Sequence, residues 1–123
     1  MINRLFIELS PYLGSPLKPT QEAILGLIFE AFSEVNQDLP ADHQLQSSAE
    51  TRISLGGVID SIHLLTILVG VEDRIQKLYN SKLDLLADPD LLSNDGPLKT
   101  AGTLATFLLS RTEGRPWAKQ ANN

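Results

Sequence analysis

The chain has 123 residues and a formal net charge of −5, with 42% hydrophobic and 20% charged residues, which is the composition of an ordinary globular domain and not of a disordered chain. The absence of cysteine excludes disulfides, thiolate metal sites and a cysteine nucleophile. The two histidines, His43 and His63, have no metal-ligand pattern around them, so we expect no metal site.

The charge is unevenly distributed along the chain. Residues 19–111 carry a net charge of −7, and the two flanks together carry +2. An acidic domain disfavours nucleic acid, whose phosphates need Lys and Arg, and favours partners with basic surfaces, although the same charge can serve solubility alone. No apolar run approaches the roughly 18 residues of a membrane span, and the N-terminal apolar stretch is too short for a signal peptide. We therefore expect a cytoplasmic protein without a membrane span, and take it to be a monomer.

The first predicted element is a helix that follows an irregular lead-in. Residues 1–18 form an N-terminal extension, because SPYLGSPLKP, at residues 10–19, contains three prolines and a glycine, which interrupt helices. Thr20 suits a helix N-cap. The sequence after it has apolar residues at helical spacing on one face, namely Ile24, Leu27, Ile28, Ala31 and Val35. This helix ends at Asp38-Leu39-Pro40.

A long connection over residues 40–60 leads to a second helix, which runs from about Ser61 to Leu78 or Tyr79. Loops of this length are uncommon in compact domains and are often functional. Pro89 and the turn at residues 94–97 leave room only for a short helix near residues 89–93.

The last predicted helix is capped by Thr100 and runs to about Arg111, with Leu104, Phe107 and Leu108 inward. Residues 112–123 form a flexible polar tail. No alternating strand pattern stands out, so the predicted fold class is all-α. Residues 19–111 make a small four-helix bundle of three longer helices and one short one, with a long loop between helices 1 and 2.

The second predicted helix has three faces when its residues are placed about 100° apart. The core face holds Leu64, Ile67, Leu68, Val71, Ile75 and Leu78. A solvated face holds His63, Thr66, Gly70, Asp73, Arg74 and Lys77. On the side adjoining Ser61 lies an apolar strip, interleaved with Glu72 and Gln76, that consists of Ile62, Leu65 and Val69. The strip either docks a partner or packs on the long loop or the N-terminal extension.

Ser61 has three interpretations. As a nucleophile it lacks a base, because residues two apart on a helix point in different directions, and His43 could approach only through tertiary contact; the G-x-S-x-G pattern is also absent. Asp60 or Ser61 could serve only as a helix N-cap. Third, Ser61 could be modified, since a phosphodiester at a helix N-terminus is favoured by the dipole and the free N–H groups.

The stretch LGGVIDSIHLLTILVGVEDRI resembles the region around the modified serine of acyl carrier proteins and of related peptidyl or aminoacyl carriers. The signature of that family is Gly-x-Asp-Ser-Leu followed by an amphipathic helix. In this chain it stands as Gly57-Val58-Ile59-Asp60-Ser61-Ile62, one residue longer after the glycine and with Ile in place of Leu. The resemblance covers about residues 20–111, including the long first loop, the short third helix and the last helix.

This resemblance implies that Ser61 carries 4′-phosphopantetheine, added from coenzyme A by a phosphopantetheinyl transferase, and that cargo is held as a thioester on this arm. The protein itself would not be an enzyme. Asp60 would be the acid that the transferase uses to place its metal ion and the serine hydroxyl. An acyl- or aminoacyl-loading ligase and downstream transferases would be further partners. They would dock through Ile62, Leu65, Val69, Glu72 and Asp73.

The chain also departs from the family pattern. His63 and Thr66 stand where housekeeping fatty-acid carriers have acids, and the N-terminal extension and residues 79–82 add length. These differences imply a specialised acyl carrier of a dedicated pathway, such as fatty acid or polyketide biosynthesis. A free-standing aminoacyl or peptidyl carrier and an unmodified helical adaptor that docks through its second helix are the alternatives.

Overall fold

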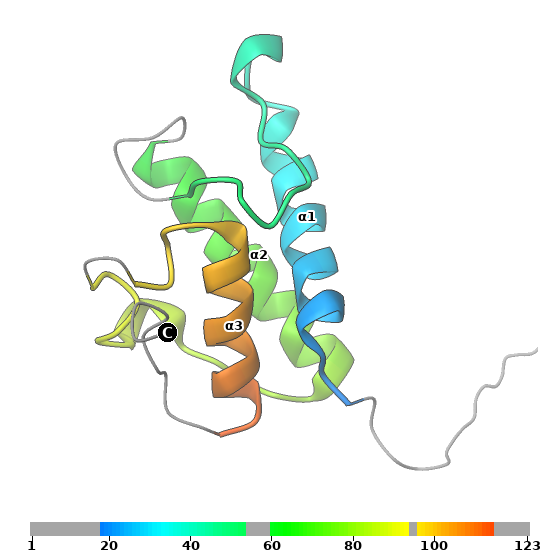
Figure 1. The fold of residues 1–123 in the computed structure, drawn as a ribbon, viewed down its shortest axis with the longest axis vertical. Helices are drawn as coiled ribbons and strands as arrows, with labels where there is room; N and C mark the ends of the chain where they lie inside the picture. The colour runs from blue at the N-terminus through cyan, green and yellow to red at the C-terminus, as the bar shows by residue number, and fades with distance from the viewer. Residues whose placement is uncertain (1–17, 54–59, 94–95, 115–123) are drawn as a thin grey trace, which may run out of the picture.

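The structure is a computed structural model that describes residues 18–53, 60–93 and 96–114. Three α-helices form its frame, α1 (Gln21–Asn36), α2 (Ser61–Tyr79) and α3 (Ala101–Thr112), and two short 3₁₀ helices, η1 (Ala41–His43) and η2 (Leu85–Ala87), lie in the connections (Figure 1). The described residues contain no β-strand, and one isolated bridge pairs Arg52 with Thr100. The predicted all-α class is confirmed.

Several predictions fall on residues outside these described ranges. They concern the N-terminal extension up to residue 17, the Gly57-Val58-Ile59 part of the serine signature, the first half of the 94–97 turn and the tail from residue 115 onward. Thr112, which we expected to begin the tail, is the last residue of α3.

Each α-helix begins directly after a residue that the sequence predicted as a cap. The Thr20 hydroxyl accepts a hydrogen bond from a backbone N–H of the first turn of α1 (3.1 Å), and Asp60 caps α2. Thr100 and Thr103 form a reciprocal capping box at the start of α3. The helix α2 ends at Asn80, whose backbone is left-handed (φ 55°), a conformation that Asn adopts more readily than most residues. Local capping chemistry therefore sets these boundaries.

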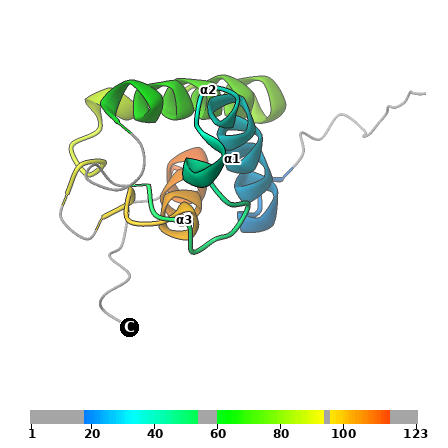
Figure 2. The same cartoon turned by 90° about the horizontal axis from the view of Figure 1, so that it is seen from above.

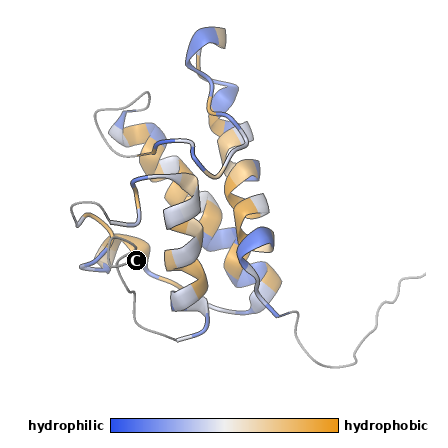
Figure 3. Ribbon diagram, in the orientation of Figure 1, coloured by the Kyte–Doolittle hydropathy of each residue, from blue (hydrophilic) through white to orange (hydrophobic). Residues whose placement is uncertain are grey.

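The helix α1 is central to the packing. It packs against both α2 and α3, while the backbones of α2 and α3 lie farther from each other than either lies from α1. Seen from above, α2 lies across the other two helices as a second layer (Figure 2). Hydrophobic residues gather along the middle turns of α1 and α2, and the first turn of α1 is hydrophilic (Figure 3). The fully buried side chains include Ile24, Ile28, Ile67, Ile75, Leu104 and Phe107.

A set of backbone hydrogen bonds, which we call the backbone clasp, joins residues 49–53 of the first connection to residues 99–102. It includes a bond from the Gly102 N–H to the Ala49 carbonyl (2.7 Å). A Cβ at Gly102 would lie 3.0 Å from that carbonyl oxygen, so the glycine lets the two backbones approach. The clasp ends at Ile53, which is fully buried, and thereby fixes the start of the segment that leads to α2.

The prediction of a short helix at residues 89–93 is wrong. The chain forms hydrogen-bonded turns in this stretch, such as the bond from the Leu91 N–H to the Asp88 carbonyl (3.2 Å). The Asp88 carboxylate accepts the Asp90 N–H (3.0 Å), and Pro89 has no N–H, so local bonds satisfy the backbone without a helix. The described residues contain three α-helices, and the predicted four-helix bundle is not confirmed.

The predicted core face of α2 is confirmed except at its end. Leu64, Ile67, Leu68, Val71 and Ile75 are buried. Leu78 is 41% exposed, because it lies in the last turn, beyond the final buried position of the helix.

Candidate functional site

Asp60 and Ser61 lie at the start of α2, where backbone N–H groups need acceptors. The Asp60 carboxylate accepts the backbone N–H of His63 (2.9 Å) and lies 3.0 Å from Nδ1 of the same residue. The His63 N–H lowers the pKa of the Asp60 carboxyl below its usual value, because a hydrogen bond to the charged form favours that form. Of the two residues that we considered as caps, Asp60 therefore has that role, as a carboxylate.

Ser61 is the first residue of α2 and is exposed. Since Asp60 supplies the cap, the Ser61 hydroxyl is not needed for capping. The ring of His63 is directed to Asp60, and His43 lies exposed in η1. Within the described ranges no hydrogen bond joins Ser61 to either histidine, so the arrangement that a serine hydrolase needs is not assembled.

The apolar strip of Ile62, Leu65 and Val69 is open to solvent. These side chains are 71%, 44% and 49% exposed, respectively. They follow Ser61 within the first turns of α2, on the side that we expected from the helical spacing. The structure thus places Asp60 and Ser61 next to the strip, which begins with Ile62, the last residue of the signature. An exposed apolar strip next to a reachable hydroxyl is suited to contact with another protein.

The two acids that we expected to help in docking, Glu72 and Asp73, have partners within the chain. The Glu72 carboxylate accepts the backbone N–H of Leu85 in η2 (2.6 Å). The Asp73 carboxylate forms an ion pair with Lys77, one turn further along α2 (3.0 Å). Glu72 therefore joins α2 to η2, and Asp73 pairs with a residue of α2 itself.

Arg74 was expected in solvent, but its guanidinium is turned onto α1. It donates to Glu30 (3.1 Å), to Glu34 (2.7 Å) and to the carbonyl of Gly70 (3.0 Å). A Cβ at Gly70 would lie 2.9 Å from Arg74 Nη1, so this glycine leaves room for the guanidinium. A glycine one turn before the arginine is the signal that the sequence offers for this contact. The shallow groove between α1 and α2 is lined by Glu34, Val69, Gly70, Asp73, Arg74 and Lys77.

Comparisons of this chain with protein-family models, with curated proteins and with solved structures find no match. In the part of the chain that the structure describes, no group of three or more His, Cys, Asp and Glu side chains could hold a metal ion. None of the described helices is both long and apolar enough to cross a bilayer. The residues around Ser61 are therefore the basis for a proposed function.

Proposed function

We propose that the protein is a carrier in which Ser61 is the attachment point of a 4′-phosphopantetheine arm that holds acyl cargo as a thioester. The observation that carries this proposal is the exposed Ser61 at the first residue of α2, directly after the capping Asp60. An attachment serine needs a hydroxyl that another enzyme can reach, and the Ser61 hydroxyl makes no hydrogen bond within the described residues. When bound, the arm supplies the thiol that a chain without cysteine lacks.

The surroundings of Ser61 fit a phosphodiester. The positive end of the α2 dipole favours an anion at this place. Asp60 adds a second negative charge to the same turn, but its carboxylate is already occupied by the His63 N–H and lies 3.0 Å from the His63 ring. The cap therefore holds Asp60 in a fixed position beside the hydroxyl, where a phosphopantetheinyl transferase can use it to place its metal ion.

The exposed strip supports docking of partner enzymes along α2. Its three apolar side chains provide the surface that is buried in a complex, and the net charge of −7 between residues 19 and 111 speeds the encounter with basic surfaces. The partners are the transferase, an acyl-loading ligase and the downstream transferases of a dedicated pathway, and the protein itself is not an enzyme.

Mass spectrometry of the intact chain tests the attachment. After incubation with coenzyme A and a broad-specificity phosphopantetheinyl transferase, we expect the mass to rise by one phosphopantetheine group. The Ser61→Ala variant should show no increase. Ser33→Ala removes another exposed serine, in α1, and should be modified like the wild type. No increase with several transferases, or an increase that persists in Ser61→Ala, would contradict the proposal.

A matched pair of variants tests the docking strip. Ile62 is 71% exposed on the strip, and Leu92 is 72% exposed in the connection between α2 and α3. We expect Ile62→Ser to lower kcat/KM of the transferase about fivefold or more, because apolar anchors at interfaces contribute most of the binding energy. Leu92→Ser should leave kcat/KM nearly unchanged. Equal effects of the two substitutions would show that the strip has no special role.

The unmodified adaptor is the second candidate function, and the exposure of Ile62, Leu65 and Val69 favours it equally. An adaptor would bind partners through the strip without any change at Ser61. It becomes the better proposal if the mass experiment gives no modification. If the modified chain accepts an amino acid but no acyl group from loading ligases, the cargo is aminoacyl or peptidyl instead.

A further inference from the structure

One segment of the connection between α2 and α3, residues 81–93, closes a side of the core, and we call it the strap. Figures 1 and 2 both place it on the side of α2 and α3 that faces away from α1. The backbones of α2 and α3 lie farther from each other than either lies from α1, and Leu85 and Leu91 of the strap are buried in the common core (1% and 2% exposed). The strap thus covers the core opposite α1.

The strap lacks the backbone–backbone hydrogen bonds that would tie it to the described helices. Its own hydrogen bonds are local turns, such as the one from the Asp88 N–H to the Leu85 carbonyl (3.1 Å). Among the described residues, no backbone–backbone hydrogen bond joins residues 81–93 to α1, α2 or α3. The backbone clasp between residues 49–53 and 99–102 provides such bonds for the first connection. The strap depends on side chains instead.

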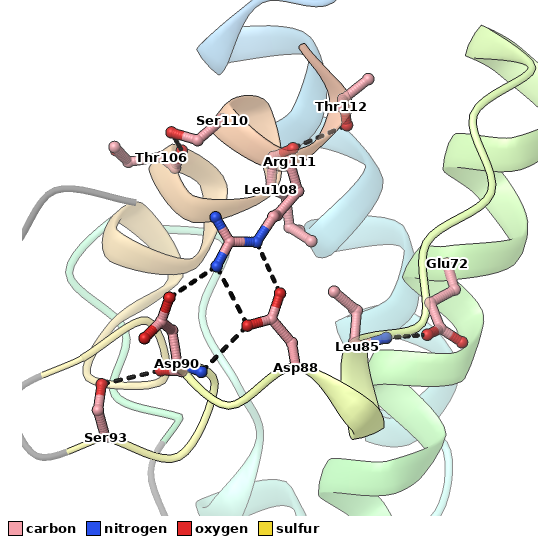
Figure 4. A network of polar contacts seen from close by, with 10 residues as sticks. All are labelled: Glu72, Leu85, Asp88, Asp90, Ser93, Thr106, Leu108, Ser110, Arg111 and Thr112. Carbon is pink, nitrogen blue, oxygen red and sulfur yellow. Dashed lines mark hydrogen bonds and ion pairs between the residues drawn. The ribbon is translucent and has the colours of Figure 1, made fainter. Parts of the chain in front are cut away.

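Charged side chains fasten the strap at two points (Figure 4). On the α2 side, the Glu72 carboxylate accepts the Leu85 N–H (2.6 Å). On the α3 side, the guanidinium of Arg111 donates to both oxygens of Asp88 (2.6 and 3.1 Å) and to Asp90 (2.7 Å). The single side chain of Arg111 therefore holds two successive turns of the strap.

The Arg111 cluster is partly removed from water. The side chains of Arg111 and Asp88 are 22% and 14% exposed, and the guanidinium lies 4.7 Å from the centre of the Phe107 ring. Without Arg111, the Asp88 carboxylate would keep its charge in a partly buried place without this cation, which is unfavourable. It would regain hydration if the strap moved away from the core. Removal of Arg111 therefore favours the open strap.

We propose that residues 81–93 open as a unit, independently of the three helices, and that Arg111 is the fastening that controls this opening. The buried leucines Leu85 and Leu91 leave the core together when the strap opens, and the apolar surface between α2 and α3 becomes accessible. Local opening of such units, with free energies below that of global unfolding, is general in proteins. The strap does not depend on the proposed role of Ser61.

Hydrogen exchange of the full chain, read by mass spectrometry, tests this proposal. In Arg111→Gln we expect exchange in residues 85–93 to become at least about tenfold faster, while amides in the middle of α1 and α2 change by less than about twofold. The matched control is Arg74→Gln. Arg74 also binds two carboxylates, and its side chain is 21% exposed. Its substitution should nevertheless leave exchange in the strap unchanged. Binding of an apolar dye should rise only in Arg111→Gln.

Three outcomes would overturn the proposal. These are unchanged exchange of residues 85–93 in Arg111→Gln, an equal acceleration in all three helices, or the same effect in Arg74→Gln. If Arg111→Gln does not fold, Asp90→Asn removes one of the ion pairs from a side chain that is 48% exposed. This milder change should still accelerate exchange in the strap alone, and no acceleration there would refute the idea.

Discussion

Arg74 and Arg111 have nearly the same chemistry but hold different kinds of structure. Each guanidinium binds two carboxylates, and the two side chains are 21% and 22% exposed. Arg74 joins α1 to α2, two helices that already pack directly through buried side chains. Arg111 joins α3 to the strap, which has no backbone–backbone hydrogen bond to the described helices and is otherwise fastened by the bond from the Leu85 N–H to the Glu72 carboxylate. The same kind of ion cluster therefore adds to an existing contact between α1 and α2, whereas it is a main attachment of the strap to α3.

The contribution of an ion pair to stability therefore cannot be derived from the geometry of the pair alone. Exposed pairs contribute about 0 to 1 kcal/mol to stability, and the Arg74 partners Glu30 and Glu34 are 64% and 56% exposed. Asp88, the partner of Arg111, is only 14% exposed. Burial of the Asp88 carboxylate, together with the lack of backbone–backbone hydrogen bonds between the strap and the described helices, gives Arg111 the larger expected effect on local structure.

The largest effect is expected for the substitution Phe32→Ala at the contact of α1 with the core. Phe32 is 1% exposed, and loss of a buried phenyl ring should lower the free energy of unfolding by about 3–5 kcal/mol. Arg74→Gln, at the contact of α1 with α2, should lower it by no more than about 1 kcal/mol. Urea unfolding monitored by circular dichroism measures both values. A larger loss in Arg74→Gln than in Phe32→Ala would reverse the comparison.

A smaller effect is expected from acid. The Arg111 guanidinium lowers the pKa of the Asp88 carboxyl, so Asp88 stabilises the folded chain above its ordinary pKa of about 3.9. This contribution is lost as the pH falls through the lowered pKa of the folded state. We expect exchange in the strap to accelerate below about pH 4, after correction for intrinsic exchange rates. In Asp88→Asn, exchange in the strap should be faster and should depend less on pH. A pH dependence as steep as that of the wild type would contradict this assignment.

The helices could be predicted from the sequence because their signals are local. Thr20, Asp60 and Thr100 lie directly before the helices that they cap, and the apolar spacing of each helix lies within a few turns. The exposed side of α2 with Ile62 and Leu65 follows from the same spacing. The candidate site could therefore be located from the sequence, and the proposal that Ser61 is modified stays a prediction.

The two arginine clusters could not be predicted, because their partners are distant in the chain. Arg74 binds Glu34, 40 residues away, and Arg111 binds Asp88, 23 residues away. Such pairs depend on how the helices pack, which periodicity does not specify. The wrong helix at residues 89–93 has a different cause, since the local hydrogen bonds of the Asp88 side chain compete with a helix.

The backbone clasp also bears on how the chain tolerates insertions. The segment before Ser61 starts at Ile53, which is anchored by the clasp and fully buried, and it ends at Asp60, which is held by its own cap. Because both anchors belong to the folded frame, extra residues placed between positions 54 and 59 would lengthen this segment at little entropic cost. Both anchors would keep their own bonds, so the folded frame on either side of this segment tolerates a change in its length.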